Sequence, residues 1–344
     1  MLRAAVICVV LAAAAPADAA DCPGNPDAIG TSRTITVDPA EHARVGSFQY
    51  PETVPLADKE VVLTFDDAPR PVYTEKVLDI LAANCVKATY FLIGSHAKEF
   101  PKVVQRIQAE GHTIGTHSQT HPLTFDRMGA DRLQKEVEGG IAAVATALGD
   151  ETQLAPFFRI PGLLRSDAVD AYLQSVGLMV WSTDVMAQDW KRRINEAGII
   201  RRALDRLAAK GNRGILLLHD IHPKTAAALP ILLAELKTRG YRIVHVVPAT
   251  PEQPATPTEP QEWVYRAPEK QPLPVLLMTD VAQLDKNLAE QRQMSGIDFC
   301  GEKISARSRR LFVDHKRPAW HRRHHAAKAT PMRREAAVTT MRTD

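Results

Sequence analysis

The stretch VVLTFDD at residues 61–67 is a short apolar, β-prone run that ends in two adjacent carboxylates. A helical pattern follows directly, because the apolar residues of 74–83 fall on one face at helical spacing. A second apolar strand, ATYFLI at residues 88–93, comes next. A strand, a helix and another strand in this order are typical of a βαβ unit with parallel strands.

The same alternation of strands and helices continues to residue 248, so the fold class is α/β. The predicted strands are apolar on both faces, as strands buried inside a parallel sheet are. No glycine-rich phosphate loop follows the first strand, which argues against a nucleotide-binding fold. A barrel and a doubly wound open sheet both fit. We predict strands at 61–65, 88–93, 112–116, 155–159, 178–181, 214–218 and 241–247, and helices at 74–83, 98–109, 130–148, 166–176, 195–209 and around 229–236.

The two ends of the chain differ in composition from this α/β region. Residues 1–19 combine a basic start, a short uncharged apolar run and a small-residue ending, which predicts a secretory signal peptide rather than a buried helix. We therefore expect an exported protein, periplasmic or secreted, with no transmembrane span. Residues 20–57 are expected to form an extended lead-in and 249–261 a Pro-rich linker. Residues 262–344 are expected to be a mostly disordered basic extension, so a chain ending at 248 should still fold.

The net charge of +3 is unevenly distributed. Twelve basic and three acidic residues lie between Lys303 and Asp344, so the rest of the chain is acidic overall. Nucleic acid is not an expected partner, because only the tail is basic and the chain is expected to be exported. Two interpretations of the tail stay open, a solvated end and an anchor to anionic polymers of the cell envelope. The sequence leaves the oligomeric state open.

Three cysteines remain once a signal peptide containing Cys8 is removed, namely Cys22, Cys85 and Cys300. Three cysteines cannot all pair within one chain, but one disulfide is expected to be possible in an oxidising compartment. The pair Cys22–Cys85 fits, because Cys22 lies just before the α/β region and Cys85 inside it, yet the sequence alone does not decide the pairing. No C-x-x-C pair is present, so cysteine-based zinc or redox sites are not expected.

Polar side chains gather where the predicted strands end. In parallel α/β folds the carboxyl ends of the strands share one face, so we expect these side chains to converge. Two imidazoles and one carboxylate make a three-ligand set with open positions, as in catalytic zinc sites. Singly, each residue has an ordinary explanation, such as a helix cap or a core histidine. The residues are Asp66 and Asp67 after the first strand, His117 and His121 after the third, Arg159 ending the fourth, Asp184 and Asp189 after the fifth, and His219 and Asp220 ending the sixth.

Five ordered motifs resemble those of the NodB-type polysaccharide deacetylases, the fourth carbohydrate esterase family. The motifs are Thr64-Phe65-Asp66-Asp67, His117-Ser118-Gln119-Thr120-His121, Arg159-Ile160-Pro161, Asp189-Trp190 and Leu216-Leu217-Leu218-His219-Asp220. The resemblance covers residues 58–248 and implies a distorted (β/α)7 barrel of parallel strands. It also implies metal-dependent hydrolysis of an N-acetyl, sometimes O-acetyl, group on a sugar polymer.

The resemblance implies a role for each residue that matches a motif. Asp67, His117 and His121 are expected to bind a divalent metal, with zinc the expected ion. Asp66 is expected to be the general base, and Arg159 to pair with it.

On the leaving-group side, the resemblance implies that His219 is the general acid and that Asp189 pairs with it. Trp190 and Leu217 are expected to wall a pocket for the acetyl methyl. The backbone N–H of Gly162 is expected to serve the oxyanion.

Two positions depart from the family pattern. Ala68 stands where the family has glycine, which costs about 1 kcal/mol if the position needs φ > 0. Gly162 stands where the family often has an aromatic residue, so one wall is lost. Asp184 has no assigned role beyond a cap or a solvent-facing acid.

The expected substrate is an N-acetylglucosamine-containing poly- or oligosaccharide of the cell envelope. Peptidoglycan, chitin oligomers and exopolysaccharide all remain open. The alternative is a non-catalytic glycan-binding protein on a decayed deacetylase fold, against which the complete set of base, acid and ligands argues.

Overall fold

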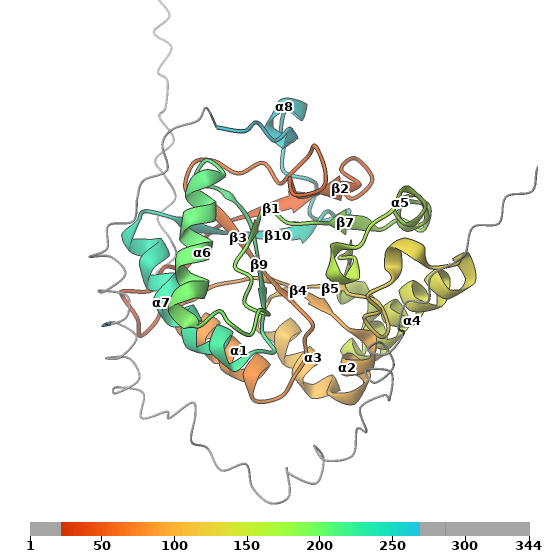
Figure 1. Ribbon diagram of the computed structural model, residues 1–344, viewed down its shortest axis with the longest axis horizontal. Helices are drawn as coiled ribbons and strands as arrows, with labels where there is room; N and C mark the ends of the chain where they lie inside the picture. The colour runs from red at the N-terminus through yellow and green to blue at the C-terminus, as the bar shows by residue number, and fades with distance from the viewer. Residues whose placement is uncertain (1–21, 269–285, 287–344) are drawn as a thin grey trace, which may run out of the picture. The chain divides into compact units, whose positions relative to one another are not determined.

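The computed structural model describes residues 22–268 and Lys286 (Figure 1). The predicted signal peptide at 1–19 lies outside the described residues, as does the predicted extension beyond residue 268 apart from Lys286. Export and the two interpretations of the tail therefore stay predictions. None of the helices in the described part combines the length and hydropathy needed to span a bilayer.

Within residues 22–268, ten strands form one sheet, and all of its paired strands run parallel. Each of the seven predicted strand positions holds a strand, and three further strands were not predicted. The strands are β1 (Thr31–Val37), β2 (Arg44–Val45), β3 (Glu60–Asp66), β4 (Thr89–Leu92), β5 (Thr113–Thr116), β6 (Leu154–Phe158), β7 (Met179–Trp181), β8 (Val185–Met186), β9 (Gly214–His219) and β10 (Arg242–Pro248).

Helices connect the strands on the outside of the sheet (Figure 1). The segment predicted as one helix at 98–109 is two helices, because Pro101 disfavours helical backbone at Phe100. Ser166 caps its helix as predicted, its side chain accepting from Val169 N at 3.4 Å. The helices are α1 (Tyr73–Ala83), α2 (Gly94–Glu99), α3 (Pro101–Ala109), α4 (Ala130–Leu148), α5 (Asp167–Ser175), α6 (Glu196–Ala209), α7 (Pro223–Thr238) and α8 (Pro260–Trp263).

The sheet curls into an incompletely closed barrel, which confirms the predicted α/β class. Strand β3 pairs with β9 on one edge and with β4 on the other, and the order continues through β5 and β6 to β7. Strand β8 pairs with β9 but not with β7 within the described residues, so the ring stays open there. The distortion therefore lies between β7 and β8, and β10 pairs with only the first two residues of β3.

The period of two along β3 decides which of its side chains reach the barrel interior. Leu63 and Phe65 pack in an apolar cluster that also contains buried side chains of the surrounding helices. Val62 belongs instead to the cluster that contains Phe91 and Trp181. Thr64 and Asp66 share the inward side with Val62 by the same alternation. The fold thus places a carboxylate inside the barrel at the end of a buried strand.

The predicted lead-in at 20–57 is built into the sheet over its described part. Strand β1 pairs in parallel with β10, and β2 pairs with β7. Ile35 and Val37 are 1% exposed, so this segment contributes to the core. The Cys22–Cys85 disulfide is present and ties the start of the segment to the end of α1. The sequence favoured an extended lead-in because this segment is rich in Pro, Gly and small polar residues and has few apolar runs.

The predicted linker at 249–261 and the start of the extension also pack on the barrel. Thr256 N donates to Thr36 O at 2.9 Å, and Thr53 N donates to Trp263 O at 2.8 Å. The Trp263 ring is 2% exposed and stacks on His42 at 3.4 Å. Residues 249–268 thus pack on the barrel where the sequence predicted a linker and the start of a mostly disordered extension, because the buried indole of Trp263 offsets the Pro-rich composition around it.

Candidate metal and catalytic site

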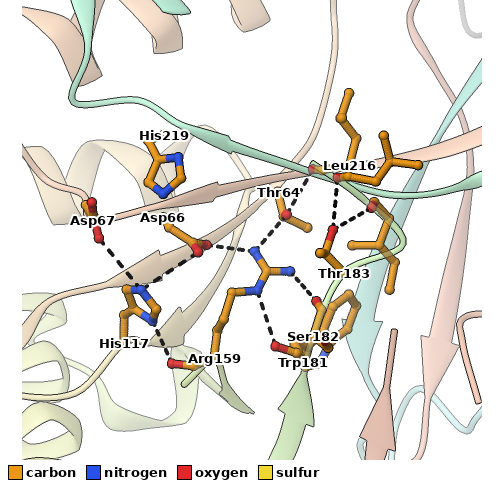
Figure 2. Close-up of polar contacts among 12 residues, drawn as sticks. Thr64, Asp66, Asp67, His117, Arg159, Trp181, Ser182, Thr183, Leu216 and His219 are labelled. Carbon is orange, nitrogen blue, oxygen red and sulfur yellow. Dashed lines mark hydrogen bonds and ion pairs between the residues drawn. The ribbon is translucent and has the colours of Figure 1, made fainter. Parts of the chain in front are cut away.

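Residues from five strand ends meet at the carboxyl edge of the barrel, as the sequence predicted. Figure 2 shows Asp66, Asp67, His117, Arg159 and His219 gathered there. Their strands are separated by up to 150 residues in sequence, yet neighbouring strands in the sheet bring them together.

Three donors form a cluster that can hold a cation. The ligand atoms of Asp67, His117 and His121 all lie within 4.8 Å of one another. Asp67 Oδ1 is 3.4 Å from His121 Nε2 and 3.7 Å from His117 Nε2. Donors about 2.1 Å from a tetrahedral zinc ion stand about 3.4 Å apart, so the spacing fits. Asp67 Oδ1 is also buried without a hydrogen-bond partner among the described residues, as a metal-ligating oxygen would be.

The backbone fixes the tautomer of the first histidine. His117 Nδ1 donates to Arg159 O at 2.6 Å, which leaves Nε2 free of its proton and facing the carboxylates. Burial lowers the pKa of His117 to about 4, so the ring is neutral near pH 7 and can act as a ligand.

Residues of α4 support the turn that carries His117 and His121. This support was not predicted from the sequence. Ser118 and His121 have φ of 66° and 56°, and Ser118 Oγ accepts from His121 N at 3.0 Å. The buried Glu136 accepts from Thr120 N at 2.9 Å and from Thr120 Oγ1 at 2.6 Å. Gly140 lets the helix approach, because a Cβ there would lie 2.7 Å from the Ser118 carbonyl carbon.

Asp67 has its own support. Its φ is 76°, and its carbonyl accepts from His96 Nδ1 at 2.9 Å. Burial raises the pKa of Asp67, but His117, His219 and His121 outweigh burial and hold that pKa below its usual value. The left-handed position falls on Asp67 and not on Ala68, so the expected cost of alanine at 68 does not arise.

Arg159 clamps Asp66 inside the barrel. Arg159 Nη1 donates to Asp66 Oδ1 at 2.7 Å and to Thr64 Oγ1 at 2.8 Å. Its Nη2 donates to Ser182 O at 2.8 Å and its Nε to Trp181 O at 3.3 Å. Both partners are nearly inaccessible, with side-chain exposures of 0% and 4%. A guanidinium held by four hydrogen bonds therefore orients the carboxylate of Asp66, whose other oxygen lies 3.7 Å from His117 Nε2.

His219 and Asp189 form a second buried pair. Asp189 Oδ1 accepts from His219 Nδ1 at 2.8 Å, and Asp189 Oδ2 accepts from His219 N at 2.7 Å and Thr225 Oγ1 at 2.8 Å. Burial lowers the pKa of His219, but Asp189 outweighs it and raises that pKa to about 9. The ring is thus an imidazolium near pH 7. Thr225, which helps to fix Asp189, was not predicted.

Of the three predicted pocket residues, Trp190 lies beside His219. The ring of Trp190 lies 5.2 Å from that of His219, edge to face, and is 39% exposed. Leu217 is buried and lies two residues before His219 on β9, on the same side of the strand. Gly162 and Leu163 both have positive φ, of 61° and 57°, so glycine at 162 suits the turn.

A side chain from the turn after β2 supports the Gly162 turn. Gln49 Nε2 donates to Leu163 O at 2.7 Å, and its Oε1 accepts from Ser182 Oγ at 2.8 Å. Since Ser182 O also binds Arg159, Gln49 links this turn to the clamp on Asp66.

Asp184 is neither a cap nor a solvent-facing acid. It is 6% exposed and accepts from Ser47 N at 2.7 Å, Thr53 Oγ1 at 2.7 Å and Ile215 N at 2.7 Å. Its carboxylate therefore joins the N-terminal segment to β9 and takes no part in the site.

The fold and site define an α/β barrel with a cluster of three donors at its carboxyl edge that can hold a cation. The sequence profile of the family described as polysaccharide deacetylase matches residues 53–181. A chitooligosaccharide deacetylase from Sinorhizobium fredii is 34% identical over 213 residues, which cover 56% of this chain and 94% of that protein. The chain belongs to the polysaccharide deacetylase family.

Two further relatives come from bacteria. A peptidoglycan-N-acetylglucosamine deacetylase from Listeria monocytogenes is 36% identical over 204 residues, covering 58% of this chain and 41% of that protein. The matched part thus spans less than half of that relative. The solved structure of a Bdellovibrio bacteriovorus peptidoglycan deacetylase has a TM-score of 0.56 and 32% identity, covering 64% of this chain and 60% of that one.

Proposed function

We propose that this protein is a metal-dependent hydrolase that removes N-acetyl groups from an N-acetylglucosamine-containing poly- or oligosaccharide. The observation that carries the proposal is the conjunction of three elements at one strand edge. They are a three-donor cluster, a carboxylate clamped by Arg159 and an imidazolium clamped by Asp189. Amide hydrolysis needs a nucleophile, a base and an acid, and this arrangement offers a residue for each part.

A divalent ion held by Asp67, His117 and His121 supplies Lewis-acid activation of water and of the amide carbonyl, and zinc is the expected ion. Asp66 takes the proton of the attacking water, and Arg159 keeps its carboxylate oriented.

His219 gives its proton to the departing amine nitrogen, which is a poor leaving group without it. Asp189 stabilises the imidazolium until that transfer. We infer that the Gly162 N–H donates to the oxyanion and that Trp190 and Leu217 enclose the acetyl methyl.

The cell envelope is the proposed setting. The sequence at residues 1–19 predicts export, and two of the relatives are named for action on peptidoglycan. We infer a periplasmic or secreted enzyme, with O-acetyl groups as a further class of substrate. The intact base, acid and ligand set favours this over a non-catalytic glycan-binding role.

Acetate release from a panel of glycans tests the proposal. Peptidoglycan strands, chitin oligomers and a neutral N-acetylated exopolysaccharide are incubated with zinc-loaded protein and with protein stripped by a chelator. We expect release from at least one glycan by the loaded protein, lost on stripping and restored by added zinc. Binding to the glycans without any acetate release would favour the non-catalytic alternative.

A further inference from the structure

The loops around the catalytic edge carry a strong excess of positive charge. On residues 67–72, 117–129, 159–166, 187–195 and 220–222, the charged side chains that are neither buried nor part of the site are almost all basic. They are Arg70, Arg127, Arg165, Lys191, Arg192 and Arg193, against Asp126. The described chain as a whole is slightly acidic, since residues 22–268 hold a few more acidic than basic residues. The positive charge is therefore concentrated at the mouth of the site.

Lys191, Arg192 and Arg193 form the densest part of this rim. All three are exposed, and none has an acidic ion-pair partner among the described residues. They follow directly on Asp189 and Trp190, the partner of His219 and the wall beside it. Arg127 and Arg165, by contrast, are paired with neighbouring aspartates.

The turn that carries these cations is held in place by hydrogen bonds to its backbone carbonyls. Lys224 Nζ donates to Lys191 O at 2.7 Å and to Ile194 O at 3.0 Å, and Ile194 N donates to Lys191 O at 2.9 Å. The side chains of Arg192 and Arg193 are therefore free to meet a ligand while their backbone stays fixed. Unpaired cations that are exposed beside a site repel one another. Binding of an anion offsets this repulsion.

We propose that the substrate is an anionic glycan, in which carboxylate groups lie on sugars next to the N-acetylated one, and that Lys191, Arg192 and Arg193 bind those carboxylates. This inference rests on the proposed function and narrows it to one substrate class. A neutral N-acetylated oligomer fills the catalytic pocket but leaves the three cations without partners. Each exposed contact contributes little alone, so the effect depends on the cluster.

The test compares two forms of one polymer. Peptidoglycan glycan strands freed of their peptides carry a lactyl carboxylate on every second sugar, and the same strands with these groups converted to primary amides are neutral. We expect the wild-type protein to show about tenfold higher kcat/KM on the carboxylate strands at low salt, a preference that shrinks as ionic strength rises.

The variant Lys191→Gln/Arg192→Gln/Arg193→Gln is expected to lose that preference, with the ratio between the two strands falling close to one. Its melting temperature checks the fold, which the hydrogen bonds to the backbone carbonyls of the turn should preserve. The matched control is Lys102→Gln/Arg201→Gln/Lys237→Gln, which removes three exposed charges from α3, α6 and α7. The control should keep the wild-type preference.

Equilibrium binding of both strands to Asp66→Asn protein separates this inference from the proposed function. Tighter binding of the carboxylate strand, lost with the Lys191–Arg193 substitutions, supports the rim even if no strand is ever hydrolysed. Equal binding and equal kcat/KM for the two strands in the wild-type protein would overturn the inference while leaving deacetylation intact. A preference that survives the triple substitution would overturn it as well.

Discussion

At the scale of single residues, the two adjacent aspartates differ because the strand ends between them. Asp66 is the last residue of β3 and faces inward to Arg159, whereas Asp67 has left-handed backbone and faces His121. A proposed base and a proposed ligand are therefore adjacent residues with different backbone conformations.

Substitution of each aspartate separates the two roles. We expect Asp66→Asn to keep its metal and lose about 10²- to 10⁴-fold in kcat, because general-base loss has that size. Asp67→Asn should lose bound metal, because two imidazoles hold a divalent ion weakly. Metal content by atomic spectroscopy, measured with acetate release, checks both. Metal lost from Asp66→Asn and kept in Asp67→Asn would reverse the assignment.

The pair of His219 and Asp189 predicts a pH effect with a definite sign. His219 acts as an acid only while protonated, so kcat/KM should fall as pH rises through its pKa of about 9. Asp189→Asn removes the carboxylate that raises this pKa, so the alkaline limb should move to lower pH. The pH profiles of the two proteins check this, with Thr225→Val as a milder variant that keeps the carboxylate. An unmoved alkaline limb in Asp189→Asn would contradict the general-acid role.

Side chains that stand in a recognisable motif, including the paired Arg159 and Asp189, could be predicted from the sequence, whereas side chains that support backbone turns could not. Asp67, His117 and His121 have side chains whose chemistry is visible in a motif. Glu136 and Gln49 instead support backbone turns, through contacts that only the folded chain creates. Asp184 shows the converse, since its acidic side chain beside a strand looked functional until its four buried acceptor contacts became visible.

At the scale of elements, the short strands and helices were the hardest to predict. The long buried strands and α4 could be predicted from the spacing of their apolar residues, and α4 matches its predicted bounds. Strand β2 and helix α8 have two and four residues, too few for any period to be read. Their positions depend on contacts with residues elsewhere in the chain. In α8, for example, the ring of Trp263 stacks on that of His42.

Trp263 makes residues 249–268 part of the folded unit. We expect Trp263→Ala to lower the free energy of unfolding by about 3–5 kcal/mol, the usual cost of truncating a buried tryptophan. The matched control is Val264→Ala, because Val264 is 46% exposed and should change stability little. Urea unfolding checks both variants.

Truncated chains test whether the whole segment 249–268 contributes to stability. A chain ending at Pro268 should fold and keep its stability, whereas a chain ending at Pro248 should be clearly less stable. Equal urea midpoints for the two truncated chains would mean that the packing of Trp263 adds nothing.

At the scale of the whole molecule, two buried histidines away from the site make stability depend on pH. Burial lowers the pKa of His112 to about 3 and that of His245 to about 4, from an ordinary 6.5. Both pKa values are lower in the folded state, so this stability is complete above about pH 6.5 and is lost as pH falls towards 4. At pH 5, the burial of each histidine should lower the free energy of unfolding by about 2 kcal/mol relative to its value above pH 6.5.

Urea unfolding of chelator-treated protein at pH 7.5 and pH 5 checks this dependence. His245→Gln keeps a donor for Thr113 Oγ1, which lies 2.8 Å from His245 Nε2, but does not titrate. Its loss of stability between the two pH values should be smaller than in the wild-type protein by about 2 kcal/mol. The same pH dependence in both proteins would mean that His245 does not govern acid stability.

The pairing of β1 with β10 has a consequence for how the chain matures. The first strand lies beside the last one, more than 200 residues later, so it stays an open sheet edge until almost all of the barrel has been made. A chain that crosses a membrane starting from its N-terminus exposes that edge for the whole crossing. The Cys22–Cys85 bond needs only the first 85 residues and can form long before β10 arrives. It would keep the early strand near its final position and shorten the search for its late neighbour.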